Sequence, residues 1–143
     1  MENNTVQEVK AKKKFLYRYK NNLACIQRLE EKLVLLDGKI KSIRSPNYSG
    51  MPRGSTPITV EDMIADKEEL EIRIAQLKNK SKRIKREILQ EIDTLEDTRY
   101  IDLLEAHFIE CKTLETIAED MGYTERYIYT LYKEAINKLI ICS

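Results

Sequence analysis

Tryptophan is absent from this 143-residue sequence, and residues that form turns are scarce, with only four glycines and three prolines. An all-β or α/β fold needs a turn after nearly every strand, so this composition argues against both classes. Charged residues make up 34% of the chain and apolar residues 42%, which is typical of helical proteins with a buried core. We therefore expect an all-α protein.

Cysteine and long apolar runs are also scarce. Cys25, Cys111 and Cys142 are odd in number and form no Cys-x-x-Cys pair, which argues against a disulfide framework or a ribbon-type zinc site. Nowhere do 18 apolar residues follow one another, and the first residues lack the basic and apolar regions of a signal peptide. We expect a cytoplasmic protein with no membrane partner.

The usual groups of catalytic residues are missing as well. His107 is the sole histidine, and Cys111 is its one partner at helical spacing, so a metal site would lack third and fourth ligands. We favour a partly exposed structural histidine. Residues 50–55 lack the Gly-Lys-Ser/Thr ending of a phosphate-binding loop. We expect no enzymatic activity, no metal and no cofactor.

Two long helices are indicated by apolar residues at alternating steps of three and four. The first runs from about Thr5 to Arg44 and the second from Thr59 to about Leu95. Thr59 offers a hydroxyl cap followed by acidic residues, which suit the first turn of a helix. Gly38 interrupts the first helix, but an interior glycine costs only about 1 kcal/mol relative to alanine, so we expect at most a kink.

The segment 45–57 holds all three prolines and two of the four glycines, which predicts a loop between the two helices. Two helices of nearly equal length joined by one loop should fold back on each other, because each alone would expose its apolar stripe. Residues 1–97 are therefore predicted to form an antiparallel helical hairpin of the coiled-coil type. Residues 98–143 are predicted to form a second domain.

The hairpin carries apolar residues beyond the stripe that joins its two helices. Residues 33–36 are apolar all round the first helix, and Ile72 lies off the seam of the second. Surplus apolar surface on a thin hairpin indicates a partner helix. We expect a homodimer or a higher homo-oligomer with Val34, Leu35 and Ile72 in its interface.

The formal net charge is +1, but the charge is distributed unevenly. From Thr94 to Ser143 five basic residues face ten acidic ones, so this part carries −5 and the rest of the chain +6. Basic residues gather at the open end of the predicted hairpin, as either a solvated helix face or a surface for DNA phosphates. The candidate phosphate contacts are Lys10, Lys12, Lys13, Lys14, Arg18, Lys82, Arg83, Lys85 and Arg86.

The last third of the chain has the pattern of a helix-turn-helix, in which two short helices cross closely. Thr113 and Thr124 are suited to capping the two helices, and Gly122 is suited to the left-handed turn between them. Small and apolar residues stand at the places where such helices pack against each other. These residues are Ile117, Ala118, Met121, Tyr123, Ile128 and Leu131.

Residues 113–139 resemble region four of bacterial sigma factors, the module that reads the promoter −35 element. Together with the hairpin, they make the chain similar to small phage and prophage proteins of Gram-positive bacteria. Those proteins are described as sigma-like or as late-gene transcriptional regulators of the ArpU and RinA type. The resemblance implies a DNA-binding protein in the cytoplasm of a bacterial host, with the start of a recognition helix in the major groove.

Carried over by position, the resemblance implies a set of DNA-binding residues on that helix. They are Thr124, Glu125, Arg126, Tyr127, Tyr129, Thr130 and Lys133. Arg126 would make a guanine contact and Lys133 a phosphate contact. Sigma-type helices usually carry basic or amide residues where this chain has Tyr127 and Tyr129, so the −35 sequence itself is not implied.

Three functions remain open at this point. The first is a sequence-specific regulator of transcription, of phage genes, that binds double-stranded DNA. The second is an adaptor that binds RNA polymerase or a sigma factor. The third is a structural or DNA-packaging oligomer, which we rank lower because packaging proteins usually place their DNA-binding part first.

Overall fold

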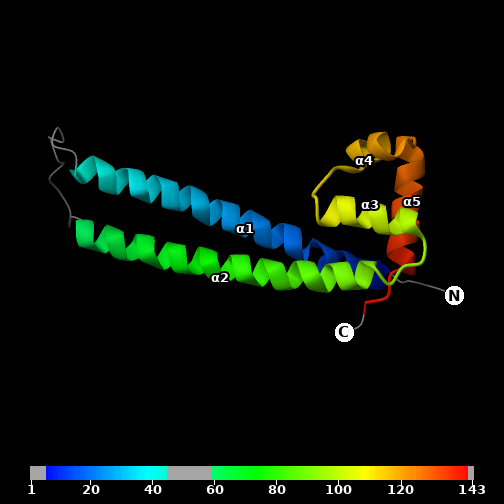
Figure 1. Cartoon of the computed structure of the whole chain (residues 1–143), viewed down its shortest axis with the longest axis horizontal. Helices are drawn as coiled ribbons and strands as arrows, with labels where there is room; N and C mark the ends of the chain where they lie inside the picture. Colours follow the sequence, from blue (N-terminus) through cyan, green and yellow to red (C-terminus); the bar gives the residue numbers. More distant parts are fainter. Residues whose placement is uncertain (1–5, 45–58, 142–143) are drawn as a thin grey trace. The chain divides into compact units, whose positions relative to one another are not determined.

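The computed structural model describes residues 6–44 and 59–141, and within these residues it contains five helices and no strand (Figure 1). This confirms the predicted all-α class. The helices are α1 (Val6–Arg44), α2 (Val60–Ile92), α3 (Thr98–Phe108), α4 (Leu114–Met121) and α5 (Glu125–Lys138). The predicted loop at 45–57 and Cys142 lie outside the described residues.

The described chain divides into two compact units, and both long helices run through both of them. Residues 23–80 contain only parts of α1 and α2, and we call them the two-helix unit. Residues up to Asn22 and from Ser81 onward contain the other parts of α1 and α2 together with α3, α4 and α5; we call them the five-helix unit. The domain boundary predicted near residue 97 stays a prediction.

In the two-helix unit α1 and α2 lie antiparallel, since residues later in α1 contact residues earlier in α2. Lys67 donates to Asp37 at 2.9 Å, and Lys78 lies 3.2 Å from Glu30. Hydrogen bonds from Lys67 and then Lys41 hold the pKa of Asp37 below its usual value. Part of the apolar seam between the two helices is only half-buried, at Leu29, Leu70 and Leu77.

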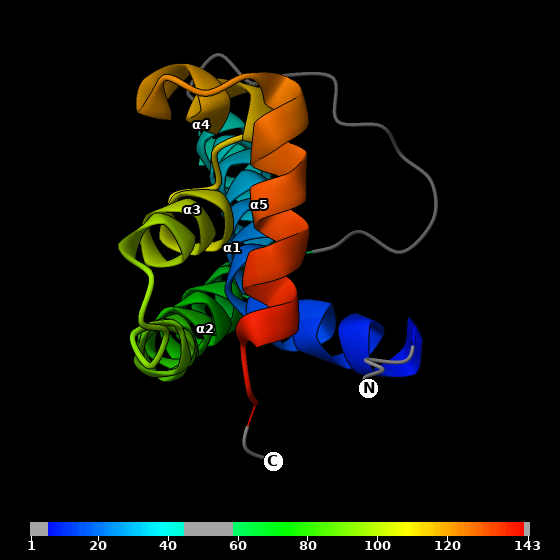
Figure 2. The same cartoon turned by 90° about the vertical axis from the view of Figure 1, so that its right-hand side faces the viewer.

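In the five-helix unit the same two helices are again antiparallel, with Arg18 paired to Glu87 at 2.9 Å. Asn22 donates to the hydroxyl of Ser81, so the two buried polar residues of the seam satisfy each other. The short helices α3, α4 and α5 contact one another pairwise, with α3 and α4 on one side of α5 (Figure 2). The residues with no more than 2% exposure are Leu16, Ile88, Ile92, Leu103, Leu104, Phe108, Ile117, Ala118, Ile128, Leu131, Ala135, Ile136 and Leu139.

Helix ends are set by local hydrogen bonds that the sequence predicts. The side chains of Thr59, Thr113 and Thr124 each accept a bond from a backbone N–H three residues later, as capping requires. Gly122 follows α4 with φ of 75°, a left-handed conformation that glycine adopts without a Cβ clash. The predicted caps and the predicted left-handed turn are therefore confirmed.

Candidate nucleic-acid interface

The structure places all seven predicted DNA-binding residues on the exposed surface at the start and outer face of α5. The opposite face of α5 is buried in the core of the five-helix unit through Ile128, Leu131, Ala135 and Ile136. The core positions 128, 131 and 135 recur at steps of three and four, and Tyr132 is buried on the same side, so the exposed residues of α5 lie on the face away from the core. The exposed residues are Thr124, Glu125, Arg126, Tyr127, Tyr129, Thr130 and Lys133.

Arg126 and Lys133 are the two cations of this exposed face. Within the described part of the chain, neither side chain has an ion-pair or hydrogen-bond partner. Their donors are therefore available to a ligand. A guanidinium can bond a guanine edge or a phosphate in bidentate fashion, whereas an ammonium serves as a point charge for phosphate.

Tyr127 and Tyr129 are exposed but already have partners. Arg99 donates to the hydroxyl of Tyr127 at 2.6 Å, and Tyr129 donates to the carboxylate of Glu115 at 3.0 Å. The bond to Glu115 raises the pKa of Tyr129 above its ordinary value. Tyr127 thus ties α5 to the start of α3, and Tyr129 ties α5 to the first turn of α4.

Thr124 and Thr130 use their hydroxyl groups locally. Thr124 caps α5 by accepting from the N–H of Tyr127 at 3.1 Å, and Thr130 donates to the carbonyl of Arg126 at 3.3 Å. The Thr124 hydroxyl still has a proton to donate, so it can contact a phosphate while it caps the helix. Glu125 is exposed in the first turn, where an acid suits the helix dipole but opposes DNA.

Arg99 is a residue of the site that sequence reasoning missed. Its backbone and side chain bond to Asp97, with the shortest bond at 2.7 Å, while its other guanidinium nitrogen reaches Tyr127. The side-chain bond from Arg99 is the main reason why the pKa of Asp97 lies below its ordinary value. Asp97 before Thr98 is a recognisable helix cap, but nothing in the sequence pairs Arg99 with a residue 28 positions away.

Two of the candidate phosphate contacts near the start of α1 contact α5 directly. Lys12 donates to the carbonyls of Ile136 and Asn137, both at 3.2 Å, and the ammonium of Lys13 lies 5.5 Å from the ring centre of Tyr132. A lysine at the carbonyl end of a helix is stabilised by the helix dipole. The start of α1 is therefore held against the last turns of α5.

The nine candidate phosphate contacts thus divide into two groups. Lys12, Lys13 and Arg18 have partners inside the protein, since Arg18 also pairs with Glu87 at 2.9 Å. The remaining six belong to the five-helix unit, are exposed and have no ion-pair partner in the described ranges. They are Lys10, Lys14, Lys82, Arg83, Lys85 and Arg86.

His107 has a structural environment. Its Nδ1 donates to the carbonyl of Lys112 at 2.8 Å, its Nε2 lies 3.5 Å from the hydroxyl of Tyr17, and its ring packs edge-on against Phe108 and Tyr132. Burial lowers the pKa of His107. In the described residues no three His, Cys, Asp or Glu side chains are placed to hold a metal.

The helical spacing assumed between His107 and Cys111 is wrong. Helix α3 ends at Phe108, and Cys111 lies beyond it with a positive φ of 61°. The sulfur of Cys111 approaches the carbonyl of Ile109 at 3.8 Å instead. Periodicity cannot be extended past a helix end, so the two side chains do not share a helix face.

Val34, Leu35 and Ile72, the predicted oligomer residues, are exposed by 71%, 69% and 59%. The oligomer interface that they would form stays a prediction. Ile72 lies midway in sequence between the half-buried Leu70 and the buried Ile74, so helical periodicity directs Ile72 away from the seam of α2. Val34 and Leu35 are exposed as well and lie off the seam of α1.

Known proteins give no independent indication of the function of this chain. No family model, curated protein or solved structure matches the chain. Across residues 6–44 and 59–141, none of the helices has the length and apolar content needed to cross a membrane.

Proposed function

We propose that α4 and α5 form a helix-turn-helix, and that the protein is a sequence-specific DNA-binding regulator of transcription that acts on phage genes in a bacterial host. The observation that carries the proposal is the division of α5 into two faces. All seven residues implied by the sigma-like resemblance are exposed, while Ile128 and Leu131 are fully buried. The proposed function is binding, without catalysis.

In this proposal the first turns of α5 enter the major groove. Arg126 donates to a guanine edge, a contact worth about 1–3 kcal/mol of discrimination between bases. Lys133 contacts a phosphate, and so does the Thr124 hydroxyl at the start of the helix. Tyr127 and Tyr129 hold α5 on α3 and α4 through Arg99 and Glu115, and present their rings to the groove.

The electrostatic attraction to DNA comes from residues outside α5. Residues 94–143 are acidic, and a module with that net charge would bind duplex DNA weakly by itself. The start of α1 is fastened to α5 by Lys12, and the exposed Lys10 and Lys14 stand two positions to either side of it, on the part of α1 that faces away from α5. In the proposal these two lysines supply additional phosphate contacts.

A second candidate function, an adaptor for RNA polymerase or a sigma factor, is favoured by one observation. A hollow of about 230 Å³ between α4 and α5 is lined by three acidic side chains, those of Glu115, Glu119 and Glu125. Negative charge there opposes phosphate and suits a basic protein surface. Co-purification with polymerase in the absence of DNA would support the adaptor.

The DNA-binding proposal is tested by binding of labelled genomic duplex fragments over a range of salt concentrations. We expect the wild-type protein to bind with an affinity that falls steeply with salt, and the Arg126→Ala/Lys133→Ala variant to lose at least tenfold in affinity. A matched control, Lys39→Ala/Lys80→Ala, removes two exposed charges from the two-helix unit and should bind as the wild type does. Equal binding by both variants would overturn the proposal.

A further inference from the structure

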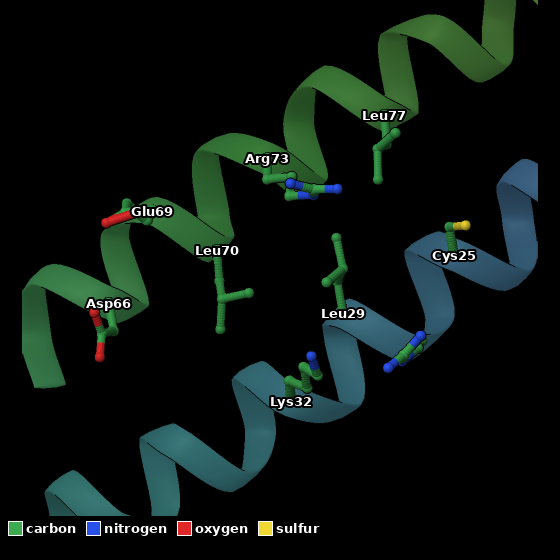
Figure 3. Close-up of a pocket in the computed structure, with 9 residues that line it drawn as sticks. Cys25, Leu29, Lys32, Asp66, Glu69, Leu70, Arg73 and Leu77 are labelled. Carbon is green, nitrogen blue, oxygen red and sulfur yellow. The ribbon is translucent and has the colours of Figure 1, made fainter.

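A groove of about 570 Å³ lies between α1 and α2 in the two-helix unit (Figure 3). Its floor is apolar, since Leu29 of α1 points toward Leu70 and Leu77 of α2 across the gap. All three leucines occupy seam positions, yet each is only half-buried. At these three leucines the seam of the two-helix unit is therefore open to one side.

The contrast with the five-helix unit shows what is missing. There the seam continues through Leu16, Ile88 and Ile92, which have 0% exposure because they belong to one core with α3, α4 and α5. In the two-helix unit α1 and α2 alone bury Ile26, Ile40 and Ile74 to 6% exposure, but the leucines that line the groove would need a further layer to be buried fully. The residues described in the two-helix unit provide no such layer.

Charged side chains along the groove are separated by sign. Asp66 and Glu69 lie at the end nearer the start of α2, while Arg28, Lys32 and Arg73 lie further along it, because α1 and α2 are antiparallel. In the described structure none of these five side chains has an ion-pair partner, although they line the same groove. The groove thus has an acidic end and a basic end, both unneutralised.

We propose that the occupant of this groove is the same groove of a second copy of the chain, in antiparallel orientation. A two-fold axis perpendicular to the helices places the acidic end of each groove on the basic end of the other, and brings the leucine floors together. A copy in the parallel orientation would place like charges together. The result is a four-helix bundle made of two helix pairs.

This interface differs from the one expected from sequence. Val34, Leu35 and Ile72 are directed outward from the helix pair, so they stay exposed in a dimer formed through the groove. The dimer does not depend on the proposed DNA binding, because every residue of the groove belongs to the two-helix unit. Dimerisation can therefore be measured in the absence of DNA.

The test is sedimentation velocity of the full chain over a concentration series, with two charge-reversed variants. Asp66→Lys/Glu69→Lys makes the groove wholly basic, and Arg28→Glu/Lys32→Glu/Arg73→Glu makes it wholly acidic. We expect the wild type to dimerise, each variant alone to dimerise at least tenfold more weakly, and an equimolar mixture of the two variants to dimerise again.

A matched control is Glu31→Lys/Glu68→Lys, which changes the net charge by the same amount as the basic variant but on exposed faces outside the groove. It should dimerise as the wild type does, and circular dichroism checks that all variants remain helical. A wild-type chain that stays monomeric at tens of micromolar would overturn the proposal and leave the groove to another protein. Failure of the mixed variants to pair would overturn the antiparallel arrangement.

Discussion

At the residue scale, two glycines of this chain have opposite effects on stability. Gly122 has a φ of 75°, which alanine adopts only at a cost of about 1–2 kcal/mol, whereas Gly38 lies inside α1, where alanine is favoured by about 1 kcal/mol. A Cβ at either position meets nothing within 4 Å, so only the backbone matters. We expect Gly122→Ala to lower the free energy of unfolding in urea and Gly38→Ala to raise it.

The two variants serve as controls for each other, because the change of side chain is the same in both. Circular dichroism during urea titration gives both free energies of unfolding. A shift of the same sign in the two variants would contradict the assigned backbone conformations.

His107 provides a second test at this scale. Burial lowers its pKa below the ordinary value of 6.5, so the folded protein favours the neutral ring, and the unfolded chain binds more protons as the pH falls through 6.5. The stabilisation that comes from keeping His107 neutral is therefore fully present above pH 6.5 and is lost as the pH falls toward the folded-state pKa. We expect the free energy of unfolding to decrease on acidification from pH 8 to 5.5, measured by urea titration.

The His107→Phe variant isolates that effect, since phenylalanine keeps a ring against Phe108 and Tyr132 but does not titrate. Burial is the main cause that raises the pKa of Glu105, so this carboxyl makes the free energy of unfolding increase as the pH falls through its titration range. The effect of Glu105 is the same in the wild type and in the variant. Identical pH dependence of wild type and variant would show that the environment of His107 does not disfavour its charged form.

At the element scale, α5 is held at its carbonyl end by a residue that is distant in sequence. Lys12 donates to Ile136 and Asn137 across 124 and 125 positions. Lys12→Met keeps most of the apolar stem and removes the charge, so we expect a loss of about 0.5–1 kcal/mol. Hydrogen exchange should increase in the last turn of α5, and urea titration measures the loss of stability.

Lys10→Met is the matched control for this prediction. Lys10 is exposed and has no ion-pair partner in the described structure, so its replacement should leave stability and exchange unchanged. An equal effect of the two variants would argue that the contact of Lys12 with α5 does not stabilise the helix end.

The helices themselves were largely predictable, because caps and periodicity depend on residues close in sequence. Thr113, Gly122 and Thr124 define the predicted ends of α4 and α5. The end of α2 was placed too late, since Leu95 continues the apolar period and is buried, yet lies beyond Ile92. The hydroxyl of Thr94 donates to the carbonyl of Glu91 at 2.6 Å and competes with the helical bond at that point.

The contacts that position the candidate site were not predictable from periodicity. Arg99 with Tyr127, Tyr129 with Glu115, and Lys12 with α5 join residues from different helices, and their pairing depends on how those helices pack. Hydrophobic spacing indicates which face of a helix is buried but not which polar partner it meets.

At the scale of the whole molecule, a net charge close to zero results from basic and acidic parts of the chain that cancel. The net charge of +1 combines the basic ends of α1 and α2 with the acidic segment from residue 94 onward. Residues 1–22 and 81–143 together contain 15 basic and 15 acidic residues, so the five-helix unit has no net charge to attract DNA. In the proposed function, DNA affinity would therefore come from specific contacts of α5 and from exposed lysines at the start of α1.

Sequencing of genomic DNA fragments retained by the protein at physiological salt tests the central claim most directly. The account predicts that a common sequence is enriched, that Arg126→Ala abolishes or changes this sequence, and that Lys10→Ala/Lys14→Ala weakens retention without changing it. Retention of fragments without any common sequence, or an unchanged sequence with Arg126→Ala, would contradict the assignment of α5 as the recognition helix.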